Sequence, residues 1–136
     1  MKGHSESPVF MMRLVKSKAN IISFQKDEKN SLTIITMWSI NGQIIGELKI
    51  PDIIIDCVVS SFAEGTVKNI IVLLTNNDEL IVIKERNFAD SSNMPNKLER
   101  IPIGSTGHTS LQMWKNTIFA NKRDRSHTMF SLEISK

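Results

Sequence analysis

The chain has 136 residues, of which 40% are hydrophobic and 23% are charged, a composition typical of a globular domain and not of a disordered chain. Its 17 basic and 14 acidic side chains leave a net charge of +3, too small to indicate nucleic-acid binding unless the charges cluster. The single cysteine, Cys57, excludes an internal disulfide. No signal-peptide run opens the sequence, and no stretch reaches the roughly 18 apolar residues of a membrane-spanning helix. We therefore expect a soluble cytoplasmic protein.

Short apolar runs, rich in β-branched residues and broken by Asn, Asp, Gly or Pro, predict strands along the whole chain. In order, the expected strands cover residues 8–15, 20–24, 32–40, 43–50, 53–60, 69–75, 79–85, 97–103, 109–115, 117–121 and 126–134. Asn41-Gly42 predicts a two-residue hairpin turn, in which both central positions need a positive φ. Residues 62–68 are expected to form a connection, and residues 88–96 a long mobile loop.

The expected strands group as four, four and three, which predicts about three copies of one unit. The spacing from Trp38 to Lys84 and from Lys84 to Phe130, each late in the third strand of its unit, is 46 residues in both cases. Propeller blades of the WD type have four strands and repeat at roughly 40 to 45 residues. We expect an all-β fold of antiparallel four-stranded blades of a WD-repeat-like β-propeller. It would form one incomplete domain over residues 1–136, with blades at about residues 8–50, 53–103 and 108–134. An unrelated β-sandwich or barrel is the alternative.

Two dipeptides resemble those of WD repeats. Gly107-His108 precedes the first strand of the third unit, and Trp38-Ser39 stands where the Trp-Asp dipeptide would fall. In that family, the histidine, the tryptophan and an aspartate between the second and third strands form a buried hydrogen-bonded brace. The resemblance implies that His108, Asp124 and Trp38 are brace residues and that His108 meets Asp124. Phe130 replaces the tryptophan of the third unit.

A longer run is more specific. MWSINGQIIGELKI, residues 37–50, followed by Pro51-Asp52, resembles part of the C-terminal propeller of BEACH-domain proteins. The resemblance extends over roughly residues 20 to 135, although only the hairpin is specific, and the chain has no BEACH domain. It implies a protein–protein interaction scaffold in vesicle trafficking or in endosomal or vacuolar membrane dynamics. Such a protein would act in the cytoplasm, or at the periphery of those membranes.

Three blades are too few for a closed ring, which needs about four to eight. A blade buries its apolar faces against its neighbours, so an isolated set of three leaves two such faces in water. We therefore expect protein partners, further blades or self-association to cover these faces. The chain alone should not behave as a simple monomer.

No catalytic, cofactor or metal site is expected, and we predict that the chain is not an enzyme. The sequence has no G-x-S-x-G, no G-x-x-x-x-G-K-[ST] and no H-E-x-x-H. One cysteine and three dispersed histidines do not supply three or four convergent metal ligands. Cys57 lies in an apolar run, which predicts a buried and unreactive thiol.

Four residues are candidate contacts for a partner. Lys122, Arg123 and Arg125 share a turn with Asp124 and could bind phosphoinositide head groups or an acidic segment; a solvated turn is the alternative. Trp114 is either blade core or an aromatic anchor for a partner. Nucleic acid is not expected, because few aromatic residues are available to stack on bases. The alternative functions are a small basic β-domain that binds nucleic acid or regulates an enzyme, and a split-gene remnant without a function of its own.

Overall fold

The computed structural model describes residues 9–15, 20–64, 66–84, 88, 98–114, 117–124 and 126–131; the side chains of residues 60–69, 114 and 131 are outside this description. The described residues form eleven β-strands. In chain order these are β1 (Val9–Val15), β2 (Asn20–Asp27), β3 (Leu32–Trp38), β4 (Ile44–Ile50), β5 (Ile54–Glu64), β6 (Thr66–Thr75), β7 (Glu79–Lys84), β8 (Glu99–Pro102), β9 (His108–Trp114), β10 (Thr117–Lys122) and β11 (His127–Ser131).

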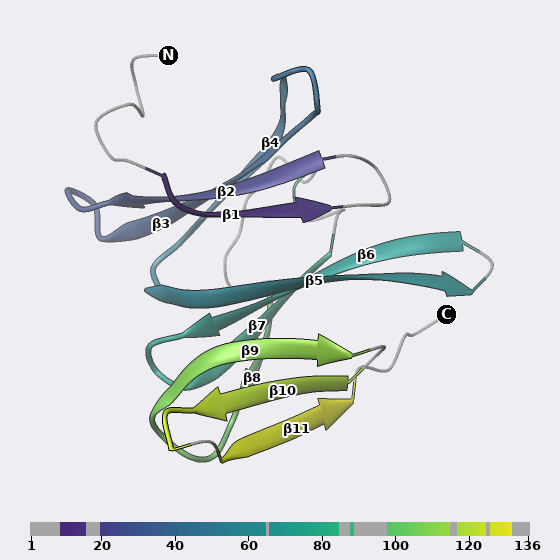
Figure 1. Ribbon diagram of the computed structural model, residues 1–136. Coiled ribbons are helices and arrows are strands. Elements are labelled where there is room, and N and C mark those ends of the chain that lie inside the picture. The colour runs from purple at the N-terminus through teal and green to yellow at the C-terminus, as the bar shows by residue number, and fades with distance from the viewer. Residues whose placement is uncertain are drawn as a thin grey trace.

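The strands build three antiparallel sheets in which each strand pairs with the next one along the chain. The first sheet has the order β1-β2-β3-β4, the middle sheet β5-β6-β7-β8 and the third sheet β9-β10-β11. The sheets are stacked, with the middle sheet between the other two (Figure 1). The all-β antiparallel fold expected from the sequence is confirmed, and the described strands do not close into a barrel.

Two hydrophobic cores hold the stack together. One lies between the first and middle sheets and includes Phe24, Ile35 and Leu73; the other lies between the middle and third sheets and includes Val72 and Ile118. The middle sheet is therefore buried on both faces. This explains why its strands read as unbroken apolar runs, IIVLL in β6 and LIVI in β7, and not as alternating patterns.

The first strand of every sheet carries an irregularity at the same place. The second residue of each of these strands has no partner in the next strand and forms a β-bulge. These residues are Phe10 in β1, Ile55 in β5 and Thr109 in β9. Such bulges bend a strand and increase its twist. The three first strands also lie against one another, β1 on β5 and β5 on β9. The three sheets thus repeat one backbone design, although their sequences share little.

The hairpin between β3 and β4 is present, but its turn differs from the expected one. The backbone N–H of Ser39 donates to the Gln43 carbonyl, 2.8 Å, and that of Gly42 donates to the Ser39 carbonyl, 3.0 Å. Three residues therefore span the turn. Among them only Gly42 has a positive φ, 88°. The longer loop is accommodated because β4 carries an extra residue, Ile45, opposite Met37 and Trp38.

The connection predicted over residues 62–68 is wrong. β5 runs through Glu64 and β6 starts at Thr66, so the described residues of this range, 62–64 and 66–68, are paired strand. The other expected loop, residues 88–96, lies outside the described residues except for Phe88, which is buried in the first core.

Gly46 allows the Phe88 backbone to approach β4. A Cβ at Gly46 would lie 2.7 Å from the Phe88 Cβ and 2.9 Å from its carbonyl carbon. Because backbone cannot move aside cheaply, we expect Gly46→Ala to lower the free energy of unfolding by about 2 kcal/mol, measured by urea denaturation. Lys49→Ala, on the exposed face of the same strand, is the control. An unchanged urea midpoint for Gly46→Ala would contradict this packing.

Candidate functional site: an exposed sheet face and its polar supports

The outer face of the first sheet carries a row of apolar side chains. Leu14 pairs with Ile21, Ile21 with Trp38, and Trp38 with Ile44, so the row crosses all four strands. The neighbouring residue in β1, Val15, points the opposite way into the first core. Leu14 is 52% exposed and Ile44 is 49% exposed. Leu14 and Ile44 at the two ends of the row are thus exposed, and Ile21 and Trp38 between them are half-buried.

A second row beside it is mixed. Met12 pairs with Ser23, Ser23 with Thr36, and Thr36 with Glu47. Met12 is exposed, whereas Ser23 and Thr36 are buried. The two rows together define what we call the outer face. It combines large exposed apolar groups with few charges, which is typical of a surface that contacts another protein.

Trp38 is held on this face by a hydrogen bond. Its indole Nε1–H donates to the Ser23 hydroxyl at 2.8 Å. The indole is thereby fixed across two strands, with its polar atom satisfied and part of its ring exposed. Ser23, the partner of this predicted brace residue, is a contact that the dipeptide pattern alone did not identify.

His108 is a buried bracing residue, but its partner is not the one expected. Its Nδ1–H donates to the Asp78 carboxylate at 2.8 Å, and the ring is fully buried. Its Nε2 lies 3.4 Å from the hydroxyls of both Ser105 and Thr128. Both ring nitrogens are thus occupied, and the expected pairing with Asp124 is corrected to pairing with Asp78.

Asp78 connects two sheets. It lies in the turn from β6 to β7 with φ 57°, and its carboxylate also accepts the backbone N–H groups of His108, 2.9 Å, and Gly107, 3.2 Å. Partial burial works against ionisation, but these hydrogen bonds and the His108 ring hold the pKa of Asp78 below its usual range. The carboxylate therefore stays charged and fastens the middle sheet to the start of β9.

Asp124 instead stays within its own turn, where it accepts the Ser126 backbone N–H at 3.0 Å and the Ser126 hydroxyl at 2.6 Å. Hydrogen bonds from the Ser126 side chain and then its backbone lower the pKa of Asp124. The turn is stabilised locally, and these hydrogen bonds of Asp124 go to Ser126 and not to His108.

A second polar bridge joins the three first strands. Arg13 in β1 donates to the Asp56 carboxylate at 2.8 Å and, through Nε, to the Cys57 carbonyl at 3.0 Å. The other oxygen of Asp56 accepts the backbone N–H of Leu111 in β9 at 2.8 Å. Asp56 thereby links all three sheets through one carboxylate.

Cys57, beside this bridge, is 1% exposed. Burial raises the pKa of its thiol far above the ordinary value. The predicted buried thiol is confirmed, and at neutral pH it stays protonated.

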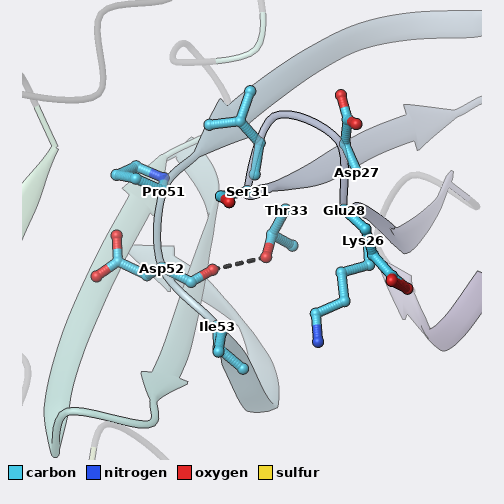
Figure 2. Close-up of a pocket in the computed structure, with 9 residues that line it drawn as sticks. Lys26, Asp27, Glu28, Ser31, Thr33, Pro51, Asp52 and Ile53 are labelled. Atoms are coloured by element: carbon cyan, nitrogen blue, oxygen red, sulfur yellow. Dashed lines mark hydrogen bonds between the residues drawn. The ribbon is translucent and has the colours of Figure 1, made fainter.

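A shallow cavity of about 350 Å³ lies between the β2–β3 turn and the link from β4 to β5 (Figure 2). Thr33 donates to the Asp52 carbonyl at 2.6 Å beside it. Arg100 binds both oxygens of Asp52, at 2.8 and 2.9 Å, and also Glu79 at 2.9 Å. The cavity also has Asp27, whose carboxylate is engaged by Asn30. The carboxylates of Asp52 and Asp27 are therefore engaged in structural contacts at this cavity.

The predicted partner contacts are only partly described. Lys122 ends β10 and is half-buried, and Arg123 is exposed in the following turn. Arg125 lies outside the described residues. Trp114 ends β9, but its side chain is also outside the description, so its two interpretations stay open.

Two features are absent from the described part of the chain. No group of three or more His, Cys, Asp or Glu side chains is placed to hold a metal ion there. Nor do these residues include a helix of the length and apolarity needed to cross a membrane.

The fold and this surface define an all-β protein of stacked antiparallel sheets with an uncovered apolar face. No protein-family model matches the chain, and no curated protein matches it.

Proposed function

We propose that the chain is a non-enzymatic protein–protein interaction scaffold, built from three blades of a WD-repeat-like β-propeller. The observation that carries the proposal is the apolar row Leu14, Ile21, Trp38 and Ile44, which crosses the outer face of the first sheet. The opposite face of that sheet packs on the middle sheet through the first core. The outer face thus has the character of a face that packs on a further sheet or on a partner.

Two further features support blades over an unrelated sandwich. The bulge recurs at the second residue of β1, β5 and β9, and these first strands lie against one another. A two-sheet sandwich has one interlayer core, whereas this chain has two, with a middle sheet buried on both sides. Repetition by a constant step is the defining property of propellers and other repeat folds.

The setting of the proposal comes from the sequence. Residues 37–50 resemble the hairpin of the C-terminal propeller of BEACH-domain proteins, which assigns the scaffold to vesicle trafficking or to endosomal or vacuolar membrane dynamics. It would act in the cytoplasm or peripherally on those membranes. The salt dependence of binding distinguishes this proposal from the alternative of a basic β-domain. The affinity for heparin or oligonucleotides falls steeply as the salt concentration rises, whereas the affinity of a contact through an apolar face does not.

The apolar face is tested by the oligomeric state. We expect the wild-type chain to self-associate as its concentration rises, measured by size-exclusion chromatography with light scattering. The double substitution Leu14→Glu and Ile44→Lys should restore a monomer, because it places charges in the apolar row. Ile40→Lys is the matched control: Ile40 is 70% exposed but lies in the turn between β3 and β4, away from the row. A sharp wild-type monomer peak at all concentrations, with a cooperative melt, would refute the expectation that the chain self-associates through this face.

A further inference from the structure

Among the described residues, the third sheet has three strands, one fewer than each of the other two. In the first sheet β4 pairs with the third strand, β3, and in the middle sheet β8 pairs with β7. The third strand of the third sheet is β11. Among the described residues, no strand pairs with the edge of β11 that faces away from β10. In Figure 1 it is the outermost yellow strand of the stack. An unpaired edge of this kind exposes a row of backbone donors and acceptors.

The backbone groups on that edge can be identified. Lys122 donates its N–H to the Ser126 carbonyl at 2.9 Å, next to the pair Asn121 and His127. In an antiparallel ladder this makes Asn121 and His127 a pair without mutual hydrogen bonds, so the bonded pairs that follow involve Thr128 and Phe130. His127 and Met129 therefore turn their N–H and carbonyl groups away from β10, toward the open edge. The Met129 side chain is 61% exposed as well.

The neighbouring turn gives the edge a charge preference. The fourth strand of each complete sheet runs antiparallel to the third, so that its last residue meets the first part of the third strand: Ile50 opposite Thr33, and Pro102 opposite Glu79. A strand added to β11 in the same sense would place its C-terminal end beside His127. Lys122 and Arg123 lie just before that point, and Arg123 forms no ion pair with a described residue. Asp124 is already engaged by Ser126.

We propose that β11 is a strand-addition site for an extended segment of another protein, with acidic residues at the segment's C-terminal end. Backbone hydrogen bonds to His127 and Met129 provide affinity, as in other complexes formed by adding a strand to a sheet edge. Lys122 and Arg123 select the acidic end and fix the direction of the added strand. The site rests on the scaffold function proposed above, but it uses an edge of the third sheet and not the outer face of the first.

The test uses the full chain and a fluorescein-labelled peptide, acetyl-Thr-Val-Thr-Val-Thr-Val-Glu-Glu, with binding followed by fluorescence anisotropy. We expect saturable binding, and binding weaker by about tenfold when the two glutamates are replaced by lysines. A version of the peptide N-methylated at alternate residues, which loses the edge-facing donors, should bind at least about tenfold more weakly. This comparison leaves the protein unaltered. Wild-type chain that binds neither charged peptide, or that binds the methylated and unmethylated peptides equally, would overturn the proposal.

Variants locate the site. Met129→Pro removes an edge donor that β10 does not use, so it should weaken peptide binding by about tenfold while Met129→Ala retains it. Arg123→Glu should reverse the preference between the acidic and basic peptides. Unchanged binding by both Met129→Pro and Arg123→Glu would place the peptide elsewhere and overturn the assignment. The double substitution at Leu14 and Ile44 should leave peptide binding intact, so loss of self-association and loss of strand addition are read separately.

Discussion

Asp78→Ala is expected to lower the free energy of unfolding by about 3 kcal/mol at pH 7, because it leaves three donors without an acceptor at the junction of the middle and third sheets. The donors are the Nδ1–H and backbone N–H of His108 and the backbone N–H of Gly107. The His108 ring is fully buried, so water cannot replace the lost partner. Urea denaturation at fixed pH measures the loss.

Asp124→Ala is the matched control, since Asp124 is the carboxylate that the dipeptide pattern pairs with His108. It is fully exposed and bonded only within its own turn, so its removal should change stability little. If the two variants lost equal stability, the assignment of Asp78 as the partner of His108 would be wrong.

The same pair has a defined pH dependence. The pKa of Asp78 is lowered in the folded chain, so its contribution is fully present above the unfolded pKa of about 3.9 and is lost as the pH falls below that value. The stability difference between wild type and Asp78→Ala should therefore shrink as the pH falls through this acidic range. A difference that grew toward low pH would contradict the sign of the pKa shift.

Asp56→Ala is the second substitution for which we expect a large loss in the free energy of unfolding. It removes the acceptor of the Leu111 backbone N–H in β9 and of the Cys57 backbone N–H, and it leaves Arg13 without its ion-pair partner. We expect a loss of about 3 kcal/mol in the free energy of unfolding. Hydrogen exchange should show faster opening at Leu111, because the Leu111 N–H loses its acceptor on the middle sheet.

Arg13→Ala provides the comparison for this bridge. The Arg13 side chain is 38% exposed, whereas that of Asp56 is 17% exposed, so water can replace more of what Arg13 contributes. Its substitution should cost less stability than that of Asp56 and should leave exchange at Leu111 near the wild-type rate. Equal losses for both would show that Asp56 acts only as the counter-ion of Arg13.

Local structure could be predicted from the sequence because it depends on neighbours in the chain. Apolar runs indicate β6 and β7, and the polar residues Asn76-Asn77-Asp78 indicate the turn between them. The structure has both strands and this turn. The connection expected at residues 62–68 is wrong because a polar stretch can still pair as a long hairpin, and composition alone does not reveal that pairing.

The polar contacts between sheets could not be predicted in the same way. Asp78 meets His108 across 30 residues of chain, and Asp56 meets Leu111 across 55. Both contacts exist only once the sheets are stacked, and no spacing rule relates their positions. Asp124 is closer to His108 along the chain than Asp78 is. In the structure, however, the β6–β7 turn places Asp78 beside Gly107 and His108. The bulges at Phe10, Ile55 and Thr109 were hidden for the same reason, because they are defined by pairing.

Within each sheet, every strand pairs with the next one along the chain, and this bears on how the molecule folds. Seven of the eight described ladders close over five residues or fewer, and the β7–β8 ladder closes over 14, residues 85–98. For most of the ladders the entropy of loop closure is therefore met in small increments. Segments farther apart in the chain meet where the sheets pack, through the two hydrophobic cores and the contacts of Asp56 and Asp78. We therefore expect the packing of the sheets on one another, and not the pairing of strands within a sheet, to set the rate of folding.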